Sequence, residues 1–270
     1  RLFVDHVAGQ NYDEIQNLRL GPDGEHLYYF GETDKEIVYH AETRVEDEEP
    51  SHKRGPFVSI DRFTMHPITG RPYFIAKSND GEHLVVGKTD NSSGISKIFD
   101  SIQLQRAVLE TQPVAIAKNA DGQHVLSGVK AGSPYRLVTQ LQAADNNSKV
   151  TYVAEVIDGE LVVLGDKEQA VYDRVEKFML TRGRKLPAYV GISTEGQRAV
   201  LNGQKAPLYK TIRTLIPLDG EAIAWLAESD DVGMVVGRDT GKLGIFDDVK
   251  DLRANPDSSG VDFFARKGDF

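Results

Sequence analysis

The chain consists of short runs of apolar and β-branched residues separated by polar turns. Residues 172–208 show the unit clearly, with an apolar run at 177–180, a β-rich run at 186–192 and a third run at 198–201. A turn at 202–205 then leads into the next aromatic residue, Tyr209. Runs of about four to seven residues with short turns are typical of antiparallel hairpins. No segment keeps a helical period over about 11 residues, so the pattern predicts an all-β chain.

This unit recurs along the sequence, and each copy is marked by an aromatic residue that has an aliphatic residue three positions later. We call the aromatic residue the anchor of its repeat. The anchors are Tyr12, Phe57, Phe99, Tyr135, Tyr172, Tyr209 and Phe246, separated by 45, 42, 36, 37, 37 and 37 residues. The aliphatic partners are Ile15, Ile60, Ile102, Val138, Val175, Ile212 and Val249. The 25 residues from Phe246 onward and the 11 residues before Tyr12 together equal one more repeat.

Other residue positions also recur in the same order in the repeats, and we call each such position a column. A small residue ends the second run of each repeat, and the column comprises Gly31, Ala76, Ala117, Ala154, Gly191, Ala227 and Ala265. A tight-turn signal follows this residue, and an apolar run ending in glycine comes next. Four strands in a repeat of about 40 residues are typical of a propeller blade. A β-sandwich has no reason to repeat at this period, and a β-solenoid has shorter coils, so we predict a seven-bladed β-propeller.

The two ends of the sequence predict how the ring closes. Residues 246–270 are expected to supply the first two strands of the last blade, with residues 261–266 as the second strand. Residues 1–11 are expected to supply the third strand, and the fourth runs through residues 12–15. Residues 1–270 would then form a single propeller domain, with Phe270 beside Arg1. Because the chain begins with Arg1 and not with methionine, we expect that a preceding export signal or expression tag has been removed.

The repeats resemble the WD40-like, TolB-type propeller repeats of bacterial proteins. The typical unit of that family has an anchor motif, a strand, a Pro-Asp-Gly turn, a second strand and a run ending in glycine. Gly21-Pro22-Asp23-Gly24 matches the central turn, Asn255-Pro256-Asp257 matches it partly and Leu218-Asp219-Gly220 matches it loosely. True WD40 signatures are missing, since Leu226 follows Trp225, the only tryptophan. The resemblance implies a role in binding a protein or another ligand, and it carries over no catalytic residue.

Composition and charge exclude several classes of function. The net charge is −9, which disfavours nucleic acid and anionic membranes as partners because both need a basic surface. The chain has no cysteine, so disulfides, thiolate metal sites and a cysteine nucleophile are excluded. The absence of cysteine is compatible with any redox compartment, so it does not locate the protein. As a separate expectation, we favour the periplasm or the cell exterior over the cytoplasm. No apolar run approaches the roughly 18–20 residues that a membrane-spanning helix needs.

Two sets of residues are candidate binding sites. The turns between the second and third strands all carry an acid, which could recruit a basic partner or could simply satisfy the requirements of a tight turn. These acids are Asp34, Asp80, Asp121, Asp158, Glu195, Asp230 and Asp269. Seven residues after three of the anchors lie Arg19, Arg106 and Arg253, on the strand expected to be innermost. There they could hold an anion at the channel mouth, or they could reach solvent.

Other features favour structural interpretations. Aspartates follow four of the anchors (Asp13, Asp100, Asp173 and Asp247), and we expect them to be turn or strand-end residues on the outer strands. Residues 44–54 form a charged insertion in the first repeat, for which a solvated loop is the simpler reading and a functional loop the alternative. The seven histidines show no metal-binding spacing, and neither a nucleophile elbow nor a phosphate loop is present. The sequence thus predicts no cofactor, no metal and no catalytic residue.

These features favour a monomeric, non-catalytic propeller scaffold that binds a protein or peptide on one face or at the central channel. The alternative is a propeller enzyme, or the accessory or gating domain of a hydrolase or lyase, with its site at the channel mouth. A structural subunit of a surface or envelope assembly is a third possibility. A fold does not by itself dictate function, so the geometry of a site has to decide among them.

Overall fold

The computed structural model describes residues 3–4, 7–8, 11–22, 24, 26–43, 52–67, 69–87, 94–108, 112–144, 149–183 and 186–268. In these residues every regular element is a β-strand. The chain divides into two compact units, Arg1–Pro134 and Tyr135–Phe270. Within the same residues, none of the structure is a helix of the length and apolar character needed to cross a membrane.

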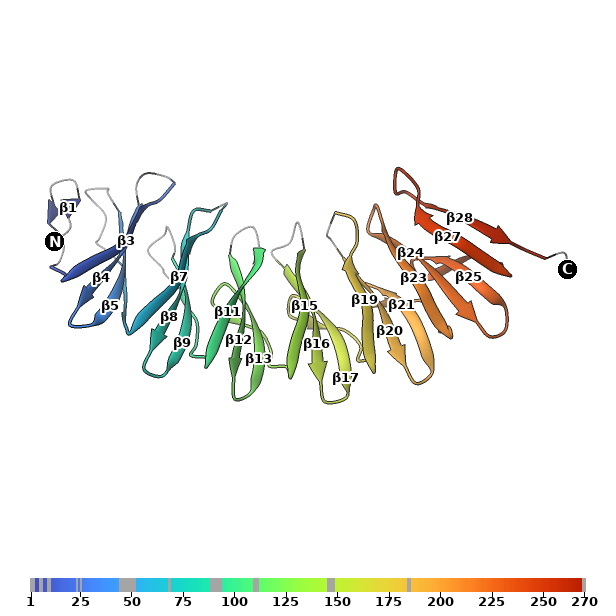
Figure 1. Cartoon of the computed structure of the whole chain (residues 1–270), viewed down its shortest axis with the longest axis horizontal. Helices are drawn as coiled ribbons and strands as arrows, with labels where there is room; N and C mark the ends of the chain where they lie inside the picture. Colours follow the sequence, from blue (N-terminus) through green and yellow to red (C-terminus); the bar gives the residue numbers. More distant parts are fainter. Residues whose placement is uncertain are drawn as a thin grey trace. The chain divides into compact units, whose positions relative to one another are not determined.

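The first unit contains three four-stranded antiparallel sheets in its described residues (Figure 1). The first sheet comprises β3 (Glu14–Leu20), β4 (His26–Thr33), β5 (Glu36–Thr43) and β6 (His52–Phe57). The second comprises β7 (Ser59–Met65), β8 (Pro72–Ser78), β9 (Gly81–Val86) and β10 (Gly94–Ile95). The third comprises β11 (Ser101–Val108), β12 (Pro113–Asn119), β13 (Gly122–Ser127) and β14 (Lys130–Ala131). A separate short hairpin pairs β1 (Phe3–Val4) with β2 (Val7–Ala8).

The second unit contains three further four-stranded sheets and one two-stranded sheet. The fourth sheet of the chain comprises β15 (Leu137–Ala144), β16 (Lys149–Val156), β17 (Gly159–Leu164) and β18 (Lys167–Glu168). The fifth comprises β19 (Arg174–Leu180), β20 (Pro187–Ser193), β21 (Gly196–Leu201) and β22 (Gln204–Lys205). The sixth comprises β23 (Thr211–Leu218), β24 (Ala222–Ser229), β25 (Gly233–Arg238) and β26 (Gly241–Phe246). The last sheet pairs β27 (Asp248–Ala254) with β28 (Val261–Arg266).

These sheets are the blades of a seven-bladed β-propeller fold, as the sequence predicts. The described residues give six four-stranded antiparallel blades and the first two strands of the seventh. The second strand predicted at residues 261–266 is β28, with the same bounds. Within residues 1–11, however, the described residues form two short strands that pair with each other, whereas one strand was predicted. The predicted closure of the ring joins residues of the two units and stays a prediction.

The anchor motif spans two consecutive blades, which corrects the prediction that it lies wholly in a fourth strand. Tyr172 pairs with Glu160 on the third strand of one blade, whereas Val175 lies in β19, the first strand of the next. Tyr209 pairs with Gln197 in the same way. Asp173 lies at the bend between these blades and not on an outer strand, because the chain has to change sheets at this point. The motif is therefore the connection between blades.

The aliphatic column and the small-residue column are direct cross-strand partners in all seven repeats. Examples are Val175 with Gly191 and Ile102 with Ala117. The anchor explains why this partner is glycine in two of the repeats. A Cβ added to Gly191 would overlap the ring of Tyr172, and one added to Gly31 would overlap the ring of Tyr12. The ring therefore occupies the space above the second strand that a larger side chain would fill.

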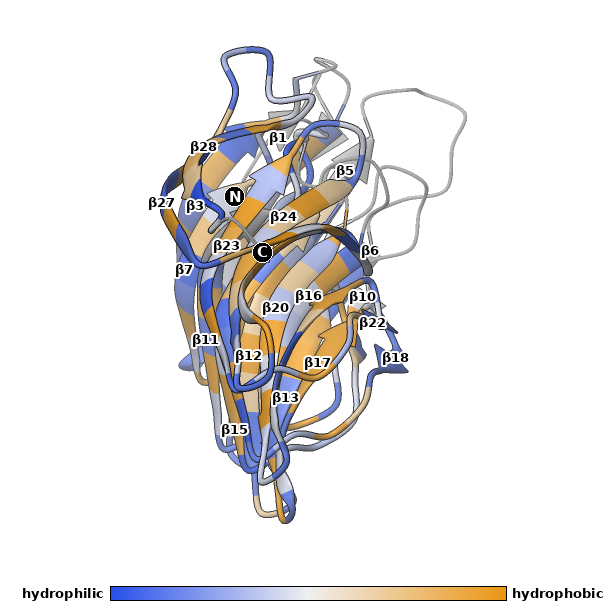
Figure 2. Ribbon diagram, turned by 90° about the vertical axis from the view of Figure 1, so that its right-hand side faces the viewer, coloured by the Kyte–Doolittle hydropathy of each residue, from blue (hydrophilic) through white to orange (hydrophobic). Residues whose placement is uncertain are grey.

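The cores lie between consecutive blades within each unit. One cluster in the second unit joins Val190 and Ala199 of the fifth blade to Trp225 and Val235 of the sixth. In the first unit, another joins Phe30 and other residues of the first blade to residues of the second. Figure 2 shows the corresponding hydrophobic colouring along central strands such as β17 and β20. Since both faces of an inner blade are buried, its second and third strands are nearly continuous apolar runs.

Candidate interaction face

The second and third strands of each four-stranded blade are joined by a tight hairpin, and we call these tips the hairpin ends. Six of the seven predicted acids lie there, and all six are exposed. They are Asp34, Asp80, Asp121, Asp158, Glu195 and Asp230. The seventh, Asp269, lies outside the described residues. The sequence therefore placed these six acids correctly, because a tight turn between two apolar runs leaves its tip in water.

Local hydrogen bonds hold three of these tips in shape. Asp80 N donates to Ser78 Oγ at 3.3 Å, and Asp121 N donates to Asn119 Oδ1 at 3.0 Å. Ser193 Oγ donates to the carbonyl of Gly196 at 3.2 Å. The glycine that follows each of these three tips has a positive φ, 137° at Gly196, which other residues rarely adopt. These turns are built from the short polar side chains and glycines that such geometry requires.

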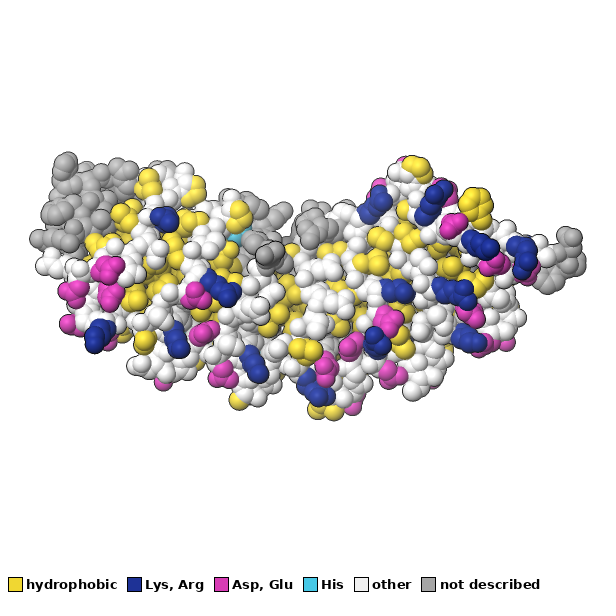
Figure 3. All heavy atoms as spheres, in the orientation of Figure 1, with side chains coloured by type: hydrophobic (Ala, Val, Ile, Leu, Met, Phe, Trp, Pro, Cys, Tyr) yellow, Lys and Arg dark blue, Asp and Glu magenta, His cyan; other side chains and the backbone are white. Residues whose placement is uncertain are grey.

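The first blade carries the densest group of acids at its hairpin end. We call these residues the blade-one acidic cluster: Asp13, Glu14, Glu32, Asp34 and Glu36. Asp34 N donates to Asp13 Oδ2 at 3.2 Å, and Gln16 Nε2 donates to Glu32 Oε2 at 3.2 Å. No ion pair joins these carboxylates to another residue in the part of the chain that the structure describes. Figure 3 shows them as a group of magenta side chains over the ends of β3, β4 and β5.

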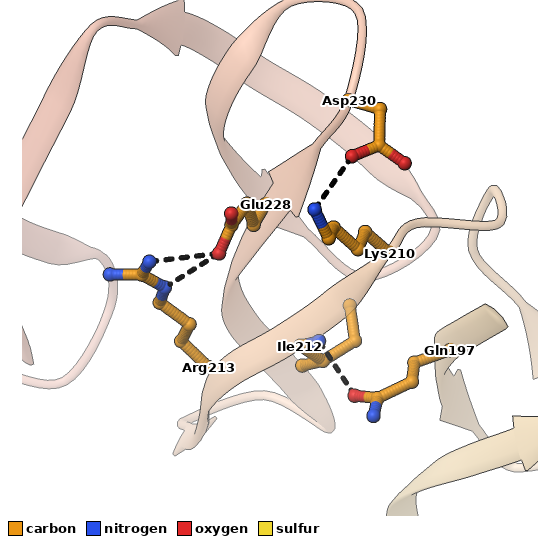
Figure 4. A network of polar contacts seen from close by, with 6 residues as sticks. All are labelled: Gln197, Lys210, Ile212, Arg213, Glu228 and Asp230. Atoms are coloured by element: carbon orange, nitrogen blue, oxygen red, sulfur yellow. Dashed lines mark hydrogen bonds and ion pairs between the residues drawn. The ribbon is translucent and has the colours of Figure 1, made fainter.

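Acids in the second unit are partly neutralised by bases on neighbouring strands. Lys210 Nζ lies 2.9 Å from Asp230 Oδ1, and Arg213 donates from Nη2 to Glu228 Oε2 at 2.8 Å (Figure 4). The hydrogen bond to Asp230 raises the pKa of Lys210. Exposed pairs of this kind contribute little to stability, but they cancel the local negative field. Asp230 is therefore a weaker attractant for a cation than the unpaired acids of the first unit.

A polar side chain after the hairpin glycine connects each of three blades to the next, a contact that the sequence analysis missed. Glu82 Oε2 accepts a hydrogen bond from Ile102 N at 2.7 Å. Glu160 Oε2 accepts one from Val175 N at 2.7 Å. Gln197 Oε1 accepts one from Ile212 N at 2.8 Å (Figure 4). The sequence does carry a signal for this contact, because a Gly-Glu or Gly-Gln pair recurs at the start of these third strands. Glutamate and glutamine both offer a side-chain oxygen that can accept the hydrogen bond.

Replacing Glu160 by leucine should destabilise the chain because the amide of Val175 would lose its acceptor at a buried joint. We expect the free energy of unfolding to fall by about 1–3 kcal/mol. Replacement by glutamine should have almost no effect, since Gln197 makes the same contact in the next blade. Chemical denaturation of the two variants gives the comparison. Equal stability of Glu160→Leu and Glu160→Gln would contradict this role for the side chain.

The three candidate arginines lie on the first strands of their sheets. Arg19 is in β3, Arg106 in β11 and Arg253 in β27. The side chains of Arg19 and Arg253 are exposed, and Arg19 Nη1 donates to the carbonyl of Leu18 at 3.3 Å. The side chain of Arg106 lies outside the described part of the structure. Because Arg19 and Arg253 belong to different units, their convergence at a channel stays a prediction.

A β-bulge interrupts the first strands next to this arginine column. The pairing register shifts between Gln16 and Arg19 and between Lys250 and Arg253. Five non-glycine residues at the same repeat position have left-handed backbone angles: Asn17, Arg62, Gln140, Lys177 and Asp251. Bulges bend an edge strand and disrupt its regular hydrogen-bonding edge, which limits unwanted pairing with another chain. The sequence pattern did not reveal them, because only Asn17 and Asp251 are of a residue type that favours a left-handed position, whereas Arg62, Gln140 and Lys177 are not.

His40 is a buried polar residue in the first blade, at a position where the next five blades have an aliphatic residue or glycine. Its cross-strand partner is Tyr29, and the two rings stack with centroids 4.6 Å apart. The equivalent third-strand residues of the next five blades are Val85, Leu126, Val163, Val200 and Gly237. His40 Nε2 shares a short hydrogen bond with the hydroxyl of the anchor Tyr12, and Nδ1 has no hydrogen-bond partner in the described structure. Burial, followed by the charge of Lys53, lowers the pKa of His40 to about 4.

This lowered pKa predicts a loss of stability in acid. The folded state favours neutral His40, so its contribution is complete above the usual pKa of 6.5 and is lost as the pH falls toward about 4. The loss should be on the order of 3 kcal/mol. We expect His40→Val to unfold with a smaller pH dependence between these values than the native chain, measured by urea denaturation. Parallel pH profiles for the two proteins would show that His40 does not titrate in this way.

The described residues contain no arrangement suited to metal binding. No group of three or more His, Asp or Glu side chains in these residues is placed to hold a metal ion. The rings of His83 and His124 instead contact their own blades. His124 Nδ1 lies 2.9 Å from the carbonyl oxygen of Gly132, and Nε2 lies 3.2 Å from Asn119 Oδ1. His83 makes the corresponding contacts with Ser96 and Ser78, so both histidines have a structural role.

The matches to this chain are among solved structures. No protein-family model and no curated protein matches the chain. Among solved structures it is similar to TolB from Acinetobacter baumannii, with 9% identity over 72% of this chain and a TM-score of 0.29. It spans about half (53%) of that TolB chain.

Two other propeller structures are also similar to the chain. The β-propeller domain of the Trilobed protease from Pyrococcus furiosus has 10% identity over 85% of this chain and 79% of its own, with a TM-score of 0.32. The Dos1 propeller has 11% identity over 95% of this chain and 80% of its own, with a TM-score of 0.34. Such distant likenesses carry no argument about function.

Proposed function

We propose that this chain is a non-catalytic β-propeller scaffold whose hairpin ends bind a basic protein or peptide partner. The observation that carries the proposal is the exposed acid at the tip of all six described hairpins. Turn chemistry alone does not require this, because asparagine, serine and glycine serve equally well in tight turns. The resemblance of the repeats to TolB-type repeats, which implies a binding role, agrees with the proposal.

Charge also favours a basic partner. The blade-one acidic cluster, Asp80 and Asp121 have no ion-pair partner among the described residues, so their negative field extends into solvent. The net charge of −9 has the same sign. Clustered like charges on an exposed surface accelerate encounter with a partner of opposite charge and make binding dependent on salt. A partner with a lysine-rich or arginine-rich surface would meet these requirements.

The test compares two double variants of equal charge. Asp80→Asn with Asp121→Asn removes two hairpin-end acids, whereas Asp166→Asn with Asp219→Asn removes two exposed acids from turns at the opposite ends of their sheets. Each immobilised protein is exposed to an extract of the source organism, and retained proteins are quantified by mass spectrometry at low and high salt. At about 0.5 kcal/mol for each charge, the hairpin-end variant should retain roughly fivefold less of a basic partner at low salt.

The control variant should bind as the native chain does. Equal retention by the two double variants would contradict the assignment of the hairpin ends. Retention that does not change with salt, or no specifically retained protein at all, would contradict the proposed function itself.

A further inference from the structure

The hairpin between β16 and β17 departs from the turn chemistry of the two-residue tips in the neighbouring blades. The corresponding two-residue tips in neighbouring blades are Asn79-Asp80, Ala120-Asp121 and Thr194-Glu195. Here the tip is Ile157-Asp158, and the Ile157 side chain is 88% exposed. The residue before the tip is Ser78, Asn119 or Ser193 in those blades, where it bonds within the turn, but it is Val156 here. The tip thus carries a large aliphatic side chain where the neighbouring blades have Asn, Ala or Thr, and the residue before it is apolar where theirs is polar. Folding does not require either change at a surface turn.

A third departure lies beside this tip on the first strand of the same blade. Two residues after the anchor, the other repeats carry Glu14, Ser59, Ser101, Arg174, Thr211 and Asp248. The fourth blade carries Leu137 at this position, and its side chain is 41% exposed. Leu137 is the cross-strand partner of Glu155, which comes two residues before Ile157 in the chain. The two apolar residues therefore lie at the same end of the same blade.

Acids flank this apolar pair. Asp158 is exposed at the tip itself, and Asp173 lies against the other side of the hairpin next to Gly159. Neither has an ion-pair partner among the residues that the structure describes. Arg136 does have one, since its Nη1 lies 3.4 Å from Glu155 Oε1. The surface is thus an apolar projection with uncompensated negative charge beside it, similar to the apolar centre and polar rim of a protein interface.

We propose that Ile157 and Leu137 form the central contact of a partner interface at the hairpin end of the fourth blade and insert into an apolar pocket rimmed by lysine or arginine on a folded protein. This inference rests on the proposed function and specifies the partner that it requires. The apolar side chain at the tip projects outward, so its complement has to be concave. Apolar pockets of that kind are found on folded proteins. Desolvated side chains at the centre of an interface carry most of its binding energy.

A photoreactive amino acid at the tip would identify the partner. Benzoylphenylalanine replaces Ile157 in one protein and Thr194, the equivalent tip residue of the next blade, in a control. Each protein is irradiated in an extract of the source organism, and the adducts are identified by mass spectrometry. We expect an adduct that forms through position 157 and much less through position 194. The cross-linked protein is then purified, and its affinity for the native chain is measured.

Point variants then decide whether the apolar side chains carry the binding. Ile157→Thr introduces the residue found at the tip of the next blade, so the fold should be retained, and a thermal unfolding curve checks this. We expect Ile157→Thr to weaken binding of the purified partner roughly tenfold or more, and Leu137→Ser to weaken it by a smaller factor. Thr194→Ala should leave the affinity unchanged.

The possible failures are distinguishable. A purified partner whose affinity is unaffected by Ile157→Thr would overturn this inference and leave the proposed function standing. An adduct with a second copy of this chain, or equal cross-linking through positions 157 and 194, would also overturn it. If neither the cross-linking nor the salt-dependent retention experiment yields a partner, both the inference and the proposed function fail.

Discussion

The anchor aromatic residue at each blade boundary is the contact on which the rest of the structure depends. In the second unit, the backbone of Tyr172 pairs with the third strand of one blade while its ring covers Gly191 on the second strand of the next. A single residue thus closes one sheet and sets the spacing to its neighbour. This double role explains why the aromatic residue and the small residue recur together through the sequence. The apolar clusters between consecutive blades form around this joint.

The same joint positions the hairpin ends. A side chain at Gly159 would overlap the carbonyl of Tyr172, so the turn glycine is fixed by the anchor that crosses it. The next residue, Glu160, then accepts a hydrogen bond from the first strand of the following blade. The tip of the fourth blade is consequently held by contacts on both sides, while its two outermost residues are free to vary. This arrangement allows a repeated scaffold to carry different surface chemistry on different blades, as Ile157 shows in the fourth.

The features that the sequence predicted correctly are those set by local chemistry. From strand alternation, tight-turn residues and the repeat period, the sequence predicted both ends of β28 and the six exposed acidic tips. The division of the anchor motif between two blades was missed, because it depends on pairing between segments that the pattern of one strand cannot reveal. The pairing of Lys210 with Asp230 and the bond from Ile212 to Gln197 were missed for the same reason. The departure of Leu137 and Ile157 was readable in the sequence once the blades were correctly aligned.

The most direct test of this account is a double-mutant cycle at Gly191 and Tyr172. In Gly191→Val, the new side chain meets the anchor ring, and we expect the free energy of unfolding to fall by about 1–3 kcal/mol. Gly241→Ala serves as a control, because its added Cβ has only an ordinary contact at 3.7 Å and should change stability little. In a Tyr172→Ala background, Gly191→Val should cost much less, because the overlapping ring is gone. Strictly additive effects of the two changes would contradict the claim that the anchor sets the spacing between blades.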